Sequence, residues 1–177
     1  MLMSIGCGSL VLASVVTAGV ALQRSMVAVE GYSIAEGDQL RVLDYVAMDC
    51  RRALSASVAN NILTLTVPAY YDSGGNPVAP TFTSTWGIQY NSGSTVTISY
   101  YQIGSNFVRS VTVGSTATTT AIATNVSTFT VTPQDLTSSV SCSITFSPRF
   151  NYLPGPGPIA GTTVYCNTFL RNAGARQ

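Results

Sequence analysis

The chain has 177 residues, which fits one domain with an appended segment, and its net charge of +1 favours neither nucleic acid nor an acidic partner. It contains no His, which removes the commonest general base and the commonest metal ligand. Nine of its fifteen charged residues lie between Arg24 and Arg52, whereas residues 58–177 combine six charges with 35 Ser and Thr. Since globular proteins average about a quarter charged residues, this polar but uncharged composition is more typical of cell-surface and secreted proteins.

An uncharged apolar segment, Met1–Leu22, opens the sequence. As a helix it rises about 33 Å, which is enough to cross the hydrocarbon core of a membrane. A secretory signal peptide is one alternative, but no basic stretch precedes the apolar run and no small-x-small cleavage site leads into a loop after it. A simple membrane anchor is a second alternative, and the segment suits that role.

Small residues are frequent in this segment, although a lone anchor needs none of them. Small side chains let helices approach closely in an apolar medium, where packing drives association. Each glycine also weakens the helix by about 1 kcal/mol relative to Ala, which favours local unwinding. The sequence therefore predicts a helix that assembles with its own copies through Ser4, Gly6, Gly8, Ser14, Thr17 and Gly19.

The helical pattern continues without Pro to about Ser57 and becomes amphipathic. Apolar positions recur every three or four residues and predict one buried face, made of Leu40, Leu43, Ala47, Cys50 and Leu54. Two ion pairs at i,i+3 spacing are expected on the polar side, Asp38 with Arg41 and Asp49 with Arg52. Asn60 and Asn61 are the expected helix stop. The division is therefore a helical stalk, residues 1–57, and a globular head, residues 58–177.

The head shows the alternation of antiparallel strands with one wet face. The predicted fold class is α+β, with a long N-terminal helical spine and a C-terminal antiparallel sheet. Linkers are expected at Asp72–Pro80, Gly114–Thr120 and Pro148–Gly161, and a hairpin link at 102–106. The predicted strands are Asn61–Val67, Thr95–Tyr101, Phe107–Val113, Val126–Val131, Ser139–Ser147 and Thr162–Leu170.

Two of the four cysteines, Cys142 and Cys166, fall on the apolar faces of the last two strands. If these strands pair through the loop 148–161, the two cysteines come within one residue of facing each other. A disulfide between them closes a loop of about 25 residues, worth roughly 3.5 kcal/mol in the chain-entropy model, and implies an oxidising compartment. Two buried free thiols are the alternative.

No catalytic constellation is present, because the abundant Ser hydroxyls have no His to act as a base and no phosphate loop occurs. The sequence predicts no cofactor and no metal site. Asp72–Asn76 contains oxygen ligands of the kind calcium prefers, but it is better explained as a glycine-rich turn. Asn125-Val126-Ser127 matches the acceptor sequence for N-glycosylation, a pattern that is common by chance.

The order of these features resembles the type IV pilin superfamily, which includes pilins and the pseudopilins of secretion systems. The helix end Leu43–Leu54 is similar to that of minor pseudopilins of the J and W types, where an acidic residue, a hydrophobe and a basic pair close the helix. Later segments resemble their head strands in order, namely Thr95–Tyr101, Phe107–Ser110, Asn125–Val131 and Thr168–Asn172. The family usually has a Glu shortly after its mature N-terminus, whereas the first Glu here is Glu30. Either a few residues, including that Glu, precede Met1, or the chain never had it.

The resemblance implies a structural subunit of an extracellular type IV pilus-like or pseudopilus filament. Its expected partners are copies of itself, the inner membrane before assembly, and sister pilin-like subunits, with no nucleic acid. The filament would lie at the cell surface after the subunit leaves the membrane. The alternative is a membrane-anchored surface binding or adhesion domain that does not polymerise. The system that such a filament serves, and a major or minor role in it, stay open.

Overall fold

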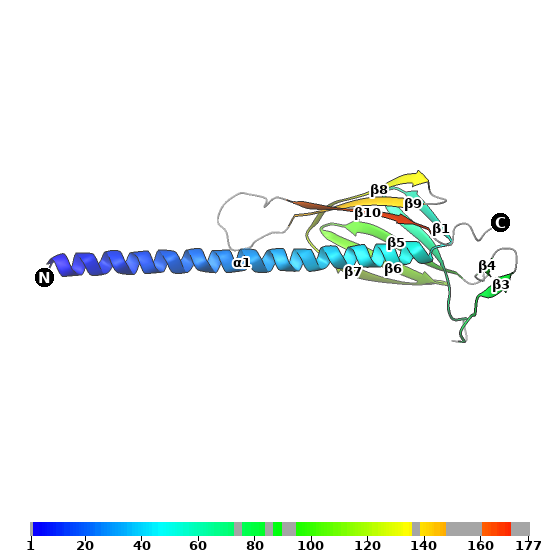
Figure 1. Cartoon of the computed structure of the whole chain (residues 1–177), viewed down its shortest axis with the longest axis horizontal. Helices are drawn as coiled ribbons and strands as arrows, with labels where there is room; N and C mark the ends of the chain where they lie inside the picture. Colours follow the sequence, from blue (N-terminus) through cyan, green and yellow to red (C-terminus); the bar gives the residue numbers. More distant parts are fainter. Residues whose placement is uncertain are drawn as a thin grey trace.

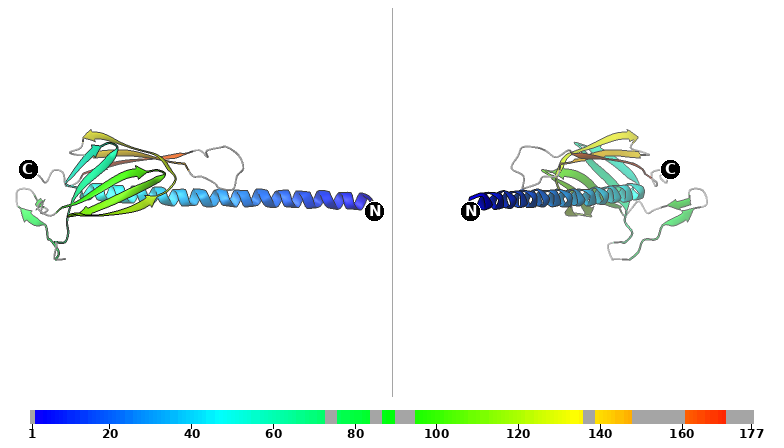
Figure 2. Two further views of the ribbon diagram at one scale, coloured as in Figure 1. Left: turned by 180° about the vertical axis from the view of Figure 1, so that it is seen from behind. Right: turned by 60° about the vertical axis from the view of Figure 1, so that its left-hand side comes forward.

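One helix of 51 residues, α1 (Leu2–Arg52), carries a β-rich head around its C-terminal part in the computed structural model (Figures 1 and 2). The structure describes residues 2–72, 76–83, 87–89, 95–135, 139–147 and 161–170. The N-terminal part of α1 projects from the head. The predicted α+β class is confirmed. The helix runs without interruption through its glycines, so no local unwinding is seen.

Within the described residues, the strands form a five-stranded sheet, a three-stranded sheet and a two-stranded ribbon, and each of these pairings is antiparallel. The five-stranded sheet has the order β1-β2-β5-β6-β7, the three-stranded sheet has the order β10-β9-β8, and β3 pairs with β4. The bounds are β1 Ser55–Ala59, β2 Ile62–Pro68, β3 Thr81–Thr83, β4 Gly87–Gln89, β5 Thr95–Ile103, β6 Asn106–Val113, β7 Thr116–Ala123, β8 Val126–Asp135, β9 Ser139–Phe146 and β10 Thr162–Phe169.

The core lies where both sheets meet the last third of α1. Val42, Val46 and Cys50, one turn apart, are fully buried, while the inner faces of the strands supply residues such as Leu65, Phe107, Phe129 and Ile144. The expected buried face was therefore wrong in part: Leu40 is 58% exposed, and Leu43 and Ala47 are half-buried. The reason is that the buried face includes two carboxylates, which a search for apolar spacing passes over.

Those carboxylates, Asp38 and Asp49, fasten the helix to the five-stranded sheet. Asp38 accepts hydrogen bonds from the backbone N–H of Thr124 at 3.0 Å and from its hydroxyl at 3.3 Å, and it pairs with Arg41 at 3.5 Å as expected. Asp49 is fully buried and accepts from Tyr100 Oη at 2.6 Å and from Arg109 Nε at 2.8 Å. The expected pair of Asp49 with Arg52 was wrong, because Asp49 faces the sheet rather than the solvent.

The helix also ends five residues earlier than predicted, because Ser55–Ala59 forms strand β1. Asn60 and Asn61, with φ of 50° and 60°, make the two-residue turn of the β1–β2 hairpin rather than a helix stop. Asn is one of the few residues that adopt this left-handed conformation readily. The division expected between residues 57 and 58 thus cuts through β1, and residues 38–54 of the expected stalk belong to the packing of the head.

Amide side chains join the two sheets. Val131 N–H donates to Asn61 Oδ1 at 3.1 Å, and the amide of Asn61 donates to the carbonyl of Phe129. Gln102 likewise accepts from the backbone N–H of Phe129 at 3.0 Å and donates to the carbonyl of Val126 at 3.1 Å. These bonds fix β8 across the ends of β2 and β5, so the head is one unit around the helix.

The linker predictions had mixed outcomes. Gly114 and Ser115 form a two-residue turn, but the following residues, expected to continue the linker, form the exposed strand β7. The hairpin predicted near 102–106 is confirmed and turns at Gly104 and Ser105. In the Asp72–Pro80 segment, Asp72 accepts from the backbone N–H of Asn76 at 2.8 Å, as a turn does. Residues 148–160 of the third expected linker lie outside the described residues.

Candidate assembly helix and cysteine pair

The projecting part of α1 exposes apolar side chains on all of its faces. From Gly8 to Met26 every residue is exposed, with Leu10 at 73% and Leu22 at 64%. The first charged residue is Arg24. The helix is long and apolar enough to span a membrane. Such a surface requires either lipid or other apolar helices around it.

Three hydroxyl groups of this segment donate hydrogen bonds to carbonyls of the helix itself. Ser14 Oγ donates to the carbonyl of Val11 at 2.8 Å, and Thr17 Oγ1 donates to the carbonyl of Ala13 at 2.8 Å. Ser9 makes the same kind of bond with the carbonyl of Gly6. Hydroxyls bonded in this way tolerate an apolar environment, because no donor is left unpaired there.

Four of the five glycines of α1 have open space where a side chain would lie. A Cβ placed on Gly6, Gly8, Gly19 or Gly37 meets no atom within 4 Å. Gly8 and Gly19 are 11 residues apart and Gly19 and Gly37 are 18 apart, so the three align within about 20° on one face. That face lies opposite the buried Val46, because Val46 follows Gly37 by nine residues, which is about two and a half turns of the helix. These three glycines therefore lie along one line of the helix that is turned away from the head, and the exposed Met26 lies on the same line.

The six residues expected to form assembly contacts are spread around the helix rather than gathered on one face. Gly6 and Thr17, 11 residues apart, share a second face of the helix, and Ser14 lies between this face and the face of Gly8 and Gly19. The side chain of Ser4 lies outside the described part of the chain. The sequence identified the small residues, but the three aligned glycines appear only when the helix is known to be continuous as far as Gly37.

Cys142 and Cys166 face each other directly in the β9–β10 pairing, so the predicted register is confirmed to within one residue. Both are buried free thiols, so the expected disulfide is not formed in this structure. Facing positions allow the bond, but its formation also requires an oxidant to remove two hydrogens. The hydrogen bond between the thiols and burial raise the pKa of Cys142, whereas the same hydrogen bond lowers the pKa of Cys166.

Asn125 lies in the exposed turn between β7 and β8 with φ of 55°. Its carbonyl accepts from the backbone N–H of Ser147 at 2.8 Å, so its backbone is held while its side chain faces the solvent. Val126 and Ser127 of the acceptor motif lie in β8, which begins at Val126 as predicted, and Asn125 lies in the turn before it. Modification at Asn125 stays a prediction.

The cluster of Asp49, Tyr100 and Arg109 was missed by sequence reasoning. The pKa of Tyr100 is raised by burial, by the charge of Asp49 and by the hydrogen bond that the Tyr100 hydroxyl donates to Asp49, so this hydroxyl stays protonated. The partners of Asp49 lie 51 and 60 residues away along the chain, and no local spacing connects them. Within the described ranges, no group of three His, Cys, Asp or Glu side chains is placed to hold a metal ion.

Comparisons of the chain with family models, with curated proteins and with solved structures find no match.

Proposed function

We propose that this protein is the structural subunit of an extracellular type IV pilus-like or pseudopilus filament that assembles through the projecting half of α1. The observation that carries the proposal is a projecting helical segment, without charge before Arg24, that exposes apolar side chains on every face at the end of a folded head. Nine large apolar side chains from Leu10 to Val29 are exposed. Their exposure to water costs about 13 to 27 kcal/mol, at about 1.5 to 3 kcal/mol each.

Lipid and a helical bundle both remove that cost, so the choice between them depends on packing. In an apolar medium helices associate where small residues let backbones approach. Gly8 and Gly19 are two such residues on one side of the projecting segment, and a Cβ at either would meet no atom within 4 Å. A subunit that leaves the membrane could thus exchange lipid for the helices of other copies, with the heads forming the outer wall. Repeated contacts of this kind that do not close give an open polymer.

The proposal gives the protein two locations and three partners. It is inserted in the inner membrane before assembly and lies in a cell-surface filament afterwards. Its partners are that membrane, copies of itself and sister pilin-like subunits. The head has a structural role in this account and no catalytic one.

Removal of Met1–Gln23 tests the proposal. The shortened chain keeps residues 38–54, which pack in the head, and loses most of the projecting apolar surface. We expect a soluble monomer by analytical ultracentrifugation, with the near-ultraviolet circular dichroism of the full chain and no filaments by electron microscopy. Filaments formed by the shortened chain would show that the assembly contacts lie elsewhere.

The second candidate is a membrane-anchored surface domain that does not polymerise. The same helix, long and apolar enough to cross a membrane, favours it. This candidate predicts a monomer in detergent and in lipid at every protein concentration. The filament subunit instead associates as detergent is removed.

A further inference from the structure

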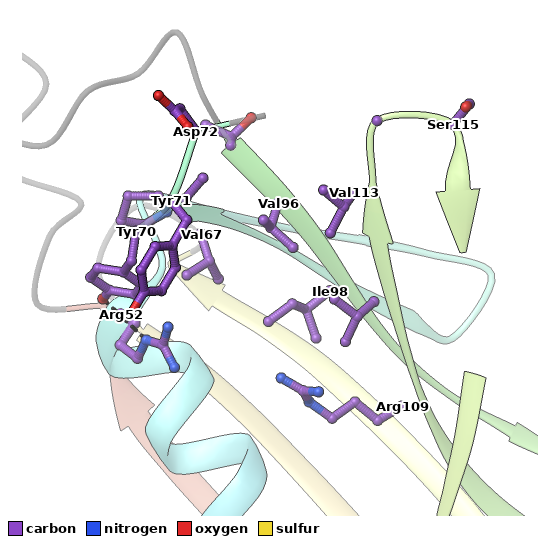
Figure 3. A pocket seen from close by; sticks show the side chains of 15 residues that line it. Arg52, Val67, Tyr70, Tyr71, Asp72, Val96, Ile98, Arg109, Val113 and Ser115 are labelled. Atoms are coloured by element: carbon purple, nitrogen blue, oxygen red, sulfur yellow. Dashed lines mark hydrogen bonds between the residues drawn. The ribbon is translucent and has the colours of Figure 1, made fainter. Parts of the chain in front are cut away.

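A cavity of about 900 Å³ lies at the end of α1, on the side of the head away from the projecting helix. Its floor is the inner face of the five-stranded sheet, made of Val67, Val96, Ile98, Val111 and Val113 (Figure 3). The helix ends at Arg52 and leaves these side chains uncovered, with Val113 at 60% exposed. The volume is that of a small-molecule site, and the floor suits an apolar ligand.

One wall of the cavity is aromatic and is braced by a cation. Tyr70 and Tyr71 follow β2, and Arg52 reaches them from the last turn of α1. Arg52 Nε donates to Tyr70 Oη at 3.1 Å, and the guanidinium carbon lies 4.6 Å from the centre of the Tyr70 ring. Tyr71 is 65% exposed. A flat ligand placed on the valine floor would therefore meet aromatic rings at its side.

A second guanidinium enters the cavity from β6. Arg109 uses its Nε for Asp49 and Tyr100, at 2.8 Å and 3.3 Å. Its two terminal amino groups donate no hydrogen bond within the part of the chain that the structure describes, and its side chain is 21% exposed. Figure 3 shows the guanidinium groups of Arg52 and Arg109 pointing toward each other from α1 and β6. A planar guanidinium with free terminal donors matches the two oxygens of a carboxylate.

The charges around these two cations limit the ligand to a weakly charged one. Asp49 offsets much of the charge of Arg109, while Asp72 lies at the rim and is held by Asn76. Because Asp49 offsets much of the charge of Arg109, a single carboxylate suits this site better than a doubly charged phosphate. We infer that this cavity binds a carboxylate carried on an apolar or aromatic body, with the carboxylate between Arg52 and Arg109. This inference is independent of assembly through α1.

The test is a titration of the full chain in phospholipid nanodiscs with 3-phenylpropanoate, followed by the NMR signals of isotope-labelled valine methyls. A ligand of this size is expected to bind in the low millimolar range. The signals of Val96, Val111 and Val113 should shift. The neutral 3-phenylpropanamide should bind about tenfold more weakly, because it cannot offer two anionic oxygens to the guanidinium groups.

Arg52→Gln should weaken the binding of 3-phenylpropanoate about tenfold. Arg51→Gln is the matched control, because Arg51 is exposed, adjacent and outside the cavity lining. It should change the affinity less than twofold. The carboxylate could belong to the C-terminal end of a polypeptide or to a small amphiphile. N-acetyl-glycyl-phenylalanine, with either a free or an amidated C-terminus, distinguishes these two sources. Tighter binding of its free acid than of 3-phenylpropanoate assigns the cavity to a polypeptide end, and weaker binding assigns it to a small amphiphile.

Three results would overturn the inference. The first is equal affinity for the acid and the amide. The second is equal loss in the Arg51→Gln and Arg52→Gln variants, which would indicate a general charge effect. The third is a response confined to valines of the projecting helix, such as Val11 and Val15, which would indicate that the probe enters the lipid instead.

Discussion

Replacement of Asp49 by Ala should remove the strongest polar connection between α1 and the sheet. Asp49 is fully buried, and its Oδ2 accepts from Tyr100 at 2.6 Å and from Arg109 at 2.8 Å. Removal of one partner of a buried ion pair costs about 3 to 5 kcal/mol, because the other charge stays buried. Two features place the expected loss of stability in Asp49→Ala near the lower end of this range. Arg109 is 21% exposed to water, and Asp49 Oδ1 has no partner within the described residues, so the pair is only half satisfied.

A loss of about 3 kcal/mol corresponds to a fall in Tm of about 6 to 12 °C for a chain of this size. The assay is thermal unfolding of the full chain in detergent, followed by near-ultraviolet circular dichroism, which reports the packing of aromatic side chains rather than the helical backbone. Asp44→Ala is the matched control, because Asp44 is exposed on the same helix. It should change stability by less than about 0.5 kcal/mol. Equal shifts for both variants would refute the assignment of Asp49 as the anchor of the helix.

Two further predictions concern the head. Oxidation of the full chain with glutathione disulfide should join Cys142 and Cys166, lower the intact mass by two hydrogens and stabilise the head by about 3.5 kcal/mol. The raised pKa of Tyr100 means that its protonated form stabilises the folded state fully below the unfolded pKa of about 10. That stability is lost as pH rises above this value, by about 1.4 kcal/mol per pH unit. Tyr100→Phe should remove this part of the slope, whereas Tyr101→Phe should keep it.

Each of these two predictions has a clear contrary result. A glutathione-treated chain that retains two reactive thiols at Cys142 and Cys166 would show that their backbones cannot approach closely enough. For the alkaline series, chemical unfolding between pH 9 and 12 gives the slope. Parallel curves for the wild type and Tyr100→Phe would mean that the Tyr100 hydroxyl is not held protonated by the fold.

The parts of the fold that were predictable from the sequence depend on local periodicity. The apolar run and its amphipathic continuation predict a single long helix, and alternation predicts β9 and β10 closely enough to bring Cys142 opposite Cys166. The end of the helix was not predictable in this way. Ser55–Ala59 is compatible with either structure, and its pairing with β2 decides the outcome. The left-handed turn at Asn60 and Asn61 was the available signal, since Asn at a two-residue link favours a hairpin.

Contacts between distant residues explain most of the remaining differences. β7 is rich in Thr, and its first six residues show no alternation of large apolar and polar side chains. The sequence pattern therefore predicts a linker there. Pairing with β6 makes it a strand. The spacing of Asp49 and Arg52 predicts an ion pair at the surface, whereas in the folded chain Asp49 pairs with Arg109, which is distant in the sequence. The cavity at the helix end likewise depends on where α1 stops relative to the sheet.

Filament yield of the Gly8→Leu variant tests the proposed assembly most directly. A side chain at Gly8 meets nothing within its own chain, so the head and membrane insertion should be unaffected. If the glycine face packs against another copy, overpacking costs about 1 to 3 kcal/mol at each contact. This lowers the association constant from about fivefold to more than a hundredfold. Val11→Leu, also exposed on the helix, is the matched control and should assemble normally. The account predicts few filaments by electron microscopy at an unchanged membrane level of Gly8→Leu, and undiminished filaments would contradict it.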